Sequence, residues 1–565
     1  MYGIRNEMKK IIMDKIGGLV RKGGYMRIYF MVLMAIVIIF VNSLSWAEVS
    51  YTSALYKNQL PVEIKNGTFY RDGKPVFFLG WHLEELNPTS HQGGNWEGSN
   101  HRIYSGVLDV ELMDEFGVNT YKTWSEGESL FLQGKIFSEK LDNETMQFYK
   151  TRQDIKRVFA NQQIGKVVSA QCFTLNSSFA RGLNKIKHLI PPEAFQTTSE
   201  WHDYFRFDPS NSFAREIYET DYKETTKFLL EIGMNPFIYH ILNEPYYNSF
   251  GKENLLNFRK WIENYYENID NANKQWGSHF NSIEEAIVLI QKNQAGVSKI
   301  APGLWIEWMD FMSDTLSNHL KGFKEDILSA DKRSVPKYFN VQPSGIPNLN
   351  SMSNVFDYTK LMEWFDVMVI EYGGPTYGGG QSAKENDPYA TGLNMSRMEK
   401  ILNMDIGRAI ANGKPVFDGE MACRRVEGGI RVSSHNYDLG TSLWEEAIHG
   451  ISFTIIYTWG SRSWEWKTYE EAKKSAMGES YRGCYLLNPY NYSLESLKDL
   501  KRFRNEIDRL ADVVLPMPRT KGKAGIIFAH KHNWLSGLKD IENFSFVQGA
   551  LMNLHIPYEN SKCFA

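Results

Sequence analysis

The chain has 565 residues, of which 42% are hydrophobic and 23% charged, and its formal net charge is −3. This balance describes a globular protein with a large core, and it excludes a disordered or collagen-like chain. The near-neutral charge argues against a nucleic-acid-binding protein, which usually carries a basic surface. The four cysteines form no closely spaced pair, so they offer neither a zinc framework nor a dense disulfide scaffold.

The N-terminal segment predicts export. Residues 28–41 (IYFMVLMAIVIIFV) are apolar, follow a basic stretch and precede the small-residue region Ser45-Trp46-Ala47. This order is typical of a secretory signal peptide, and the apolar core is shorter than the ~20 residues of a membrane span. We therefore expect residues 1–47 to be a signal peptide of a secreted or periplasmic protein. An uncleaved membrane tether through residues 28–45 stays open as the alternative.

The next segment predicts a hairpin followed by eight strands. Residues 66–75 (NGTFYRDGKP) carry an Asp72-Gly73 pair suited to a tight hairpin turn. Eight runs rich in β-branched and aromatic residues come after it, and their near-continuous apolar character is typical of parallel strands covered by helices on both faces. The runs are 76–82, 118–124, 166–173, 237–244, 335–342, 365–372, 415–420 and 451–459.

Helical patterns separate these runs. Phe258, Trp261, Ile262 and Tyr265 follow i, i+3, i+4, i+7 spacing, and residues 304–328 form a long stretch that is apolar on one side. Alternating strands and helices predict an α/β fold, with a closed (β/α)8 TIM barrel over residues 48–515 as the leading architecture. An open doubly wound sheet is the alternative, but no strand is followed by a Gly-rich phosphate loop.

A second, smaller unit is expected at residues 516–565. Pro516 and Pro518 indicate a linker after a helix that carries Leu500, Phe503 and Ile507 on one face. A strand at 524–529 and a helix at 541–554 follow, which predicts the start of a small α/β domain that is too short to be complete.

Two glutamates stand out because each follows an apolar run. Glu244 closes the run 237–244 and precedes Pro245, and Glu420 closes the run 415–420. Barrel enzymes keep their catalytic residues at the carboxyl ends of the strands, and counting strands places the two glutamates on the fourth and the seventh. Glycoside hydrolysis with retention needs two carboxyl groups about 5 to 5.5 Å apart, one protonated and one ionised. The charge of one carboxylate helps to raise the pKa of the other.

The motif Asn243-Glu244-Pro245 on strand four, with Glu420 on strand seven, resembles the clan of retaining (β/α)8 glycoside hydrolases. The resemblance implies that Glu244 is the acid/base, that Glu420 is the nucleophile and that Asn243 hydrogen-bonds the sugar 2-hydroxyl. Residues 258–277 resemble the segment that follows the acid/base strand in family 42 β-galactosidases, and residues 524–558 are similar to the start of that family's trimerisation domain. The resemblance covers roughly residues 66–565 and leaves a homo-oligomer open.

Two departures from family 42 keep other substrates open. That family usually has Asn-Glu-Tyr where this chain has Asn243-Glu244-Pro245, and Asn-Glu-Pro is commoner in family 5 cellulases and mannanases. The trimerisation-like segment is also incomplete.

Further residues are candidates for substrate contacts. Trp459 ends the eighth run, at the position where the clan has an aromatic platform beneath the sugar. Tyr372 could hydrogen-bond the nucleophile, with Tyr377 as its competitor. His82 follows the first strand and could line the sugar pocket, and Glu371 is the rival carboxylate, with substrate binding as its expected role.

The sequence thus predicts a retaining glycoside hydrolase, with a β-galactoside as the first substrate and an oligosaccharide or polysaccharide as the partner. A β-mannanase or β-glucanase of the family 5 type is one alternative, and a non-catalytic glycan-binding barrel is another. No HExxH motif, EF-hand loop or Ser-His-Asp signature stands out, so we expect neither a metal nor a cofactor.

Overall fold

The computed structural model divides the chain into two compact units, Met1–Gln59 and Leu60–Ala565. All described residues belong to the second unit, so the predicted signal segment lies outside them. No helix among them is long and apolar enough to cross a membrane. The described residues are 61–83, 117–124, 170–174, 191–196, 207–231, 236–243, 247, 249–293, 296–342, 355–370, 395–422, 424–427, 430–433, 438–457, 494–516, 524–528, 535, 547, 550–551, 554 and 558–562.

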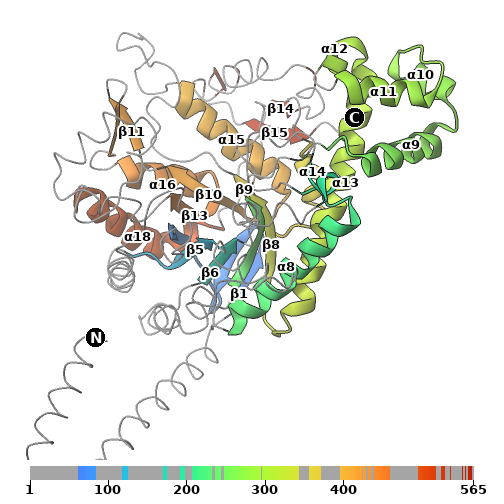
Figure 1. Cartoon of the computed structure of the whole chain (residues 1–565). Coiled ribbons are helices and arrows are strands. Elements are labelled where there is room, and N and C mark those ends of the chain that lie inside the picture. The colour runs from blue at the N-terminus through green and yellow to red at the C-terminus, as the bar shows by residue number, and fades with distance from the viewer. Residues whose placement is uncertain are drawn as a thin grey trace, which may run out of the picture. The chain divides into compact units, whose positions relative to one another are not determined.

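An eight-stranded parallel sheet forms the centre of this unit (Figure 1). Its strands are β4 (Phe78–Leu83), β5 (Thr120–Trp124), β6 (Ala170–Thr174), β7 (Pro236–Asn243), β8 (Tyr338–Gln342), β9 (Met368–Ile370), β10 (Val416–Ala422) and β13 (Ile451–Tyr457). The order β8-β7-β6-β5-β4-β13-β10-β9 joins the eighth strand in sequence to the first, because β13 pairs with β4. Each of the eight predicted runs overlaps one of these strands.

The two ends of this order meet. The backbone N–H of Asp366, two residues before β9, donates to the carbonyl of Phe339 in β8 at 3.1 Å. The Phe339 N–H in turn donates to the Asp366 carboxylate at 3.0 Å. These contacts bring β8 and β9 together, so the sheet closes into the predicted (β/α)8 barrel.

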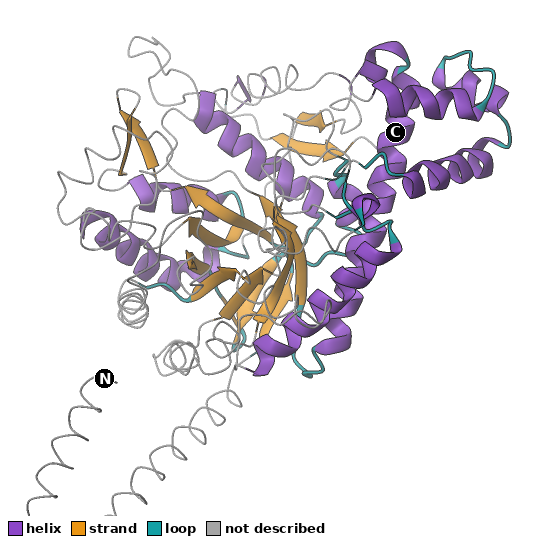
Figure 2. Ribbon diagram, viewed as in Figure 1, coloured by secondary structure: helices purple, strands orange, loops and turns teal. Residues whose placement is uncertain are grey.

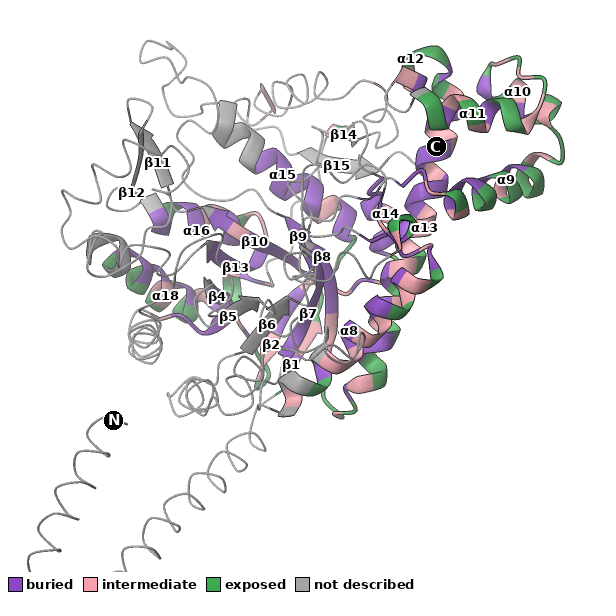
Figure 3. Ribbon diagram, in the orientation of Figure 1, coloured by how far each residue is buried: buried purple, intermediate pink, exposed green. Residues whose placement is uncertain are grey.

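Helices surround the barrel strands, as Figure 2 shows. The described helices are α8 (Ser212–Glu231), α9 (Lys252–Tyr266), α10 (Ile269–Trp276), α11 (Ile283–Asn293), α12 (Val297–Ile300), α13 (Pro302–Ala330), α14 (Tyr358–Leu361), α15 (Met395–Ala411), α16 (Asp438–Ile448) and α18 (Leu494–Val514), with the short 3₁₀ helix η4 (Pro192–Ala194). The predicted helices at 258–265 and 304–328 are α9 and α13. In Figure 3 the described residues of β7, β8, β9, β10 and β13 are mainly buried, whereas α9, α10 and α11 alternate between buried and exposed residues.

The N-terminal hairpin covers the amino end of the barrel. It is a three-stranded antiparallel sheet of β1 (Val62–Lys65), β2 (Thr68–Arg71) and β3 (Lys74–Pro75), one strand more than the sequence predicted. Asp72 and Gly73 form the predicted turn, both at positive φ (51° and 72°). Phe69 points into the barrel, where its ring meets those of Phe78, Phe237 and Phe453 edge-on at 5.6 to 6.0 Å.

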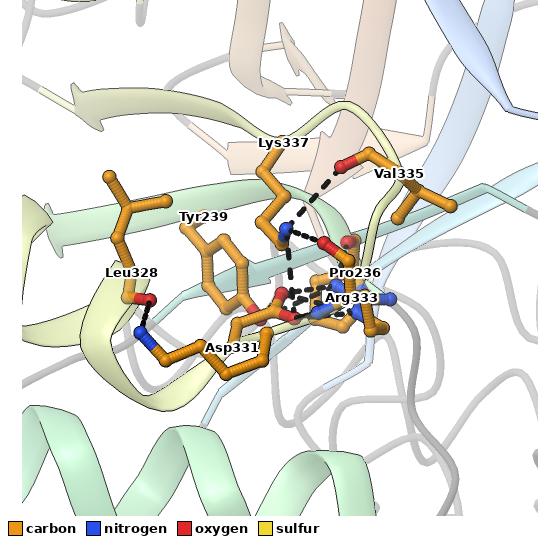
Figure 4. A network of polar contacts seen from close by, with 8 residues as sticks. Pro236, Tyr239, Leu328, Asp331, Arg333, Val335 and Lys337 are labelled. Atoms are coloured by element: carbon orange, nitrogen blue, oxygen red, sulfur yellow. Dashed lines mark hydrogen bonds and ion pairs between the residues drawn. The ribbon is translucent and has the colours of Figure 1, made fainter.

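A buried ionic network fixes the same end of the barrel (Figure 4). Asp331, in the connection from α13 to β8, accepts hydrogen bonds from Arg333 (2.6 and 2.9 Å) and from the Tyr239 hydroxyl (2.8 Å). Arg333 also donates to the carbonyl of Pro236 at the start of β7 (2.8 Å). Burial alone would raise the pKa of Asp331, but Arg333 outweighs burial and holds the pKa below its ordinary value.

Two small strand pairs complete the described structure. β11 (Arg424–Glu427) and β12 (Ile430–Ser433) form an antiparallel pair directly after β10. β14 (Ala524–Phe528) and β15 (Tyr558–Lys562) form a parallel pair beside α15. β14 is the strand predicted for the C-terminal unit, and most of the helix expected at 541–554 lies outside the described residues.

Candidate active site

The structure describes the predicted site residues to different extents. The side chain of Glu420 is described and is half-buried in β10. Asn243 and His82 are placed as the last residue of β7 and a residue of β4, without a description of their side chains. Four predicted site residues lie outside the described residues: Glu244, Glu371, Tyr372 and Trp459. Tyr377, the competitor of Tyr372, lies outside them as well.

The barrel places the two predicted catalytic strands on different sides of the ring. Counted from β4, β7 is the fourth strand and β10 the seventh, so β8 and β9 separate them on the short side of the ring. The carboxyl ends of parallel strands meet at one rim. Asn243 ends β7 at this rim, with Glu244 next in the chain, and Glu420 lies in the last part of β10.

A β-bulge shapes the backbone at Glu420. Asp418 pairs with Thr454 and Met421 with Ile456, so β10 uses three steps where β13 uses two. The sequence predicted that this strand ends at Glu420, but β10 continues to Ala422. A bulge turns a side chain away from the regular alternation, and bulges are common at barrel rims beside active sites.

Asp418 holds this bulge and was not among the predicted site residues. Its side chain is fully buried, and its Oδ1 accepts a hydrogen bond from the backbone N–H of Glu420 at 3.2 Å. The contact fixes the backbone that carries the Glu420 carboxyl. An aspartate two residues before a strand-terminal glutamate is the only signal that the sequence offered for it.

β7 contains a similar irregularity just before Glu244. His240 pairs with Asn340 and Asn243 with Gln342, so β7 also uses three steps where β8 uses two. Strands β7 and β10 therefore both depart from regular pairing near their carboxyl ends, where bulges are common beside active sites.

Three of the barrel strands carry fully buried polar residues. His240, Asn340 and Asp418 are fully buried on β7, β8 and β10. The His240 ring meets the Phe417 ring at 6.2 Å, and Phe417 stacks on Phe453 at 4.0 Å. Along β7 and β10 the buried side chains thus change from Phe237 and Phe417 to polar groups toward the carboxyl end. The apolar runs of the sequence did not reveal this change.

The described residues contain no group of three or more His, Cys, Asp or Glu side chains placed to hold a metal ion. The chemistry that they offer at the rim is that of the Glu420 carboxylate on a backbone shaped by a bulge.

Comparison with known proteins gives a family match over the part of the chain that contains β7 and β10. Residues 211–478 match the glycoside hydrolase 42 family model, described as "Beta-galactosidase". The matched segment runs from α8 to beyond β13 and includes both predicted catalytic glutamates. A search of curated protein sequences gives no significant match.

Solved structures of low sequence identity share the fold. The β-galactosidase from Bacillus circulans sp. alkalophilus has a TM-score of 0.59 and 14% identity, with 87% of this chain and 66% of that chain covered. The β-galactosidase from Rahnella sp. R3 has a TM-score of 0.61 and 15% identity, with 87% and 65% covered. The GH42 exo-carrageenase from Bacteroides ovatus has a TM-score of 0.57 and 16% identity, with 93% and 65% covered. The chain spans about two thirds of the length of these proteins.

The closed barrel and these structural matches show that the chain has a (β/α)8-barrel fold. Within that fold, residues 211–478, just under half of the chain, are similar to the family 42 glycoside hydrolases, as the sequence resemblance predicted.

Proposed function

We propose that the chain is a retaining β-glycosidase of the β-galactosidase type. The observation that carries the proposal is the position of Glu420 on strand seven of a closed barrel whose strand four ends at Asn243, within the segment matched by the family model. Strands four and seven lie on different sides of the rim, across which two carboxyl groups must meet for double displacement.

In this mechanism Glu420 attacks the anomeric carbon and forms a covalent glycosyl-enzyme, while Glu244 protonates the departing oxygen. Glu244 then takes a proton from water, which attacks the anomeric carbon and releases Glu420. Asn243 hydrogen-bonds the 2-hydroxyl of the sugar, a contact that strengthens in the transition state. Asp418 holds the backbone of the nucleophile through its contact with the Glu420 N–H.

The test is turnover of aryl β-galactoside, β-mannoside, β-glucoside and β-fucoside by wild type, Glu420→Ala and Glu244→Ala. We expect one glycoside to be turned over, and we expect Glu420→Ala to lose about 10⁴-fold or more, because a covalent intermediate cannot form without its nucleophile. Glu263→Gln is the matched control, since this exposed carboxylate lies on α9. Full activity of Glu420→Ala would refute the mechanism.

A galactan is the second candidate substrate. The exo-carrageenase from Bacteroides ovatus covers 93% of this chain, more than the two β-galactosidases compared above. Wild type that ignores all aryl glycosides but releases sugar from carrageenan would favour this candidate. Release from mannan or β-glucan would favour the family 5 type of activity.

We further propose that residues 1–47 direct export and that cleavage follows Ala47, with a membrane tether through residues 28–45 as the alternative. N-terminal sequencing of the protein recovered from the cell exterior and from membranes distinguishes the two. Sedimentation of the purified protein tests the homo-oligomer that the trimerisation-like segment suggests.

A further inference from the structure

A buried polar cluster joins two segments at the carboxyl rim of the barrel. One segment contains Asp208 and Ser210 and leads into α8; the other contains Tyr247 and Ser249 and leads from β7 into α9. Both segments follow a barrel strand and precede a helix, so they lie on the side of the barrel where catalytic residues are placed. The cluster was not predicted from the sequence.

Asp208 is the centre of the cluster and is 2% exposed. Its Oδ1 accepts from the Ser210 N–H (3.0 Å) and the Tyr247 hydroxyl (3.2 Å). Its Oδ2 accepts from the Ser249 hydroxyl (2.5 Å) and the Asn254 side-chain amide (3.0 Å). Three of these four donors come from the segment between β7 and α9 or from the first turn of α9, so one carboxylate holds that connection at three points.

Neighbouring groups tie the cluster to the rest of the barrel wall. The Ser210 hydroxyl donates to the Asn254 side-chain oxygen (2.6 Å) and lies 3.2 Å from Nε2 of His319 on α13. Gly251 approaches so closely that a Cβ there would lie 3.0 Å from Oδ2 of Asp208. The connection after β7 is thus held against the segment that precedes α8, and Tyr247 also meets the His319 ring of α13.

The partners of Asp208 are neutral. No described Lys or Arg forms an ion pair with it, and burial raises its pKa against the opposing effect of the hydrogen bonds. Burial and the charge of Arg215 lower the pKa of His319 to about 4, so this ring is neutral at neutral pH. A buried carboxyl held only by neutral donors costs stability when ionised, which suggests that the cluster serves the geometry of the site.

The cluster lies three residues along the chain from the predicted acid/base. Asn243 is fixed on one side of Glu244 by its pairing with Gln342, and the fully buried Tyr247 is fixed on the other side by Asp208. The nearest described residues before and after Glu244 in the chain are therefore both held by contacts. We propose that Asp208, acting through Tyr247 and Ser249, is a positioning residue for the acid/base Glu244, an inference that rests on the proposed function.

A positioning role and a purely structural role predict different kinetics. If Asp208 positions the acid, its loss matters most for a leaving group that needs a proton. A 2,4-dinitrophenyl β-glycoside needs almost no proton, whereas a phenyl or methyl β-glycoside needs one. Lower stability alone would remove folded enzyme and reduce kcat/KM on both substrates by the same factor.

The experiment measures kcat/KM of wild type, Asp208→Asn, Tyr247→Phe and Glu244→Ala on these two kinds of glycoside. Asp208→Asn puts an NH₂ where one oxygen accepts two hydrogen bonds, and Tyr247→Phe keeps the ring but removes one donor. Asp326→Asn is the matched control. This buried aspartate of α13 accepts a hydrogen bond from Arg215 of α8 (2.7 Å), and none of its described contacts joins it to the cluster.

We expect Asp208→Asn to lose about 10²-fold on the poor leaving group and less than about 3-fold on the dinitrophenyl glycoside, in the same direction as Glu244→Ala. Tyr247→Phe should show a smaller loss with the same preference, and it tests the inference if Asp208→Asn does not fold. Equal losses on both substrates, or a leaving-group dependence like that of the control, would overturn the inference and leave the proposed function intact. Absence of turnover by wild type on every substrate would overturn both.

Discussion

The two ends of the barrel each bury an aspartate, and the surroundings of the two differ. At the amino end Asp331 is paired with Arg333, and its pKa is lowered. At the carboxyl end Asp208 is held by neutral donors, and its pKa is raised. The first end combines an aromatic plug with a compensated charge, which stabilises the fold. The second end keeps buried polar groups without a counter-ion, which is the kind of cost that proteins accept at functional sites.

The largest expected effect on stability comes from the plug. Phe69→Ala removes a fully buried ring that contacts three barrel phenylalanines. We expect a loss of about 3–5 kcal/mol in the free energy of unfolding, measured by urea denaturation. The kcat/KM per folded molecule should change by less than about 3-fold, because the plug lies at the end of the barrel opposite the site.

The conservative variant Phe69→Leu should cost about 1–1.5 kcal/mol, since most of the volume is kept. A large change in kcat/KM of folded Phe69→Ala would show that the two ends of the barrel are coupled. It would contradict the assignment of stability to one end and function to the other.

The pH dependence of stability should have opposite sign for the two aspartates. The lowered pKa of Asp331 contributes stability that is present above its unfolded pKa of about 3.9 and is lost as the pH falls through the folded pKa. Asp331→Asn should therefore cost about 1–3 kcal/mol at pH 7, and the difference from wild type should shrink below about pH 4.

The raised pKa of Asp208 has the reverse consequence. Its ionisation opposes folding at neutral pH, and this cost disappears as the pH falls through the folded pKa toward about 3.9. Urea titrations of Asp208→Asn and wild type from pH 3 to 7 should show the variant gaining relative stability with rising pH. The contrast between the two aspartates would be wrong if the stabilities of Asp331→Asn and Asp208→Asn, each relative to wild type, changed with pH in the same direction.

A smaller effect on activity is expected at the bulge of β10. Asp418→Ala removes the acceptor for the Glu420 N–H and should lower kcat/KM about 10-fold, because the nucleophile loses part of its positioning. Asp418→Asn keeps an acceptor oxygen and should remain closer to wild type. Equal kinetics of Asp418→Ala and wild type would show that the strand holds the bulge without this contact.

The smallest effect is expected on the exposed helices outside the barrel. Arg259 and Glu263 on α9 form an ion pair at 2.9 Å, with their side chains 45% and 43% exposed. Glu263→Gln should change the free energy of unfolding by less than about 0.5 kcal/mol and leave kcat/KM unchanged, because water and salt screen such pairs. Urea denaturation at low and high salt measures this, and a loss above about 1 kcal/mol would contradict it.

The sequence by itself determined the strands, the long helices, the Asp72-Gly73 turn and the positions of Asn243 and Glu420 near the ends of strands four and seven. These features depend on local periodicity and on turn chemistry, which neighbouring residues fix. Only the tertiary structure decided the closure through Asp366 and Phe339, the bulges on β7 and β10, and the cluster around Asp208. Register and long-range hydrogen bonds form between segments far apart in the chain, so no local pattern specifies them.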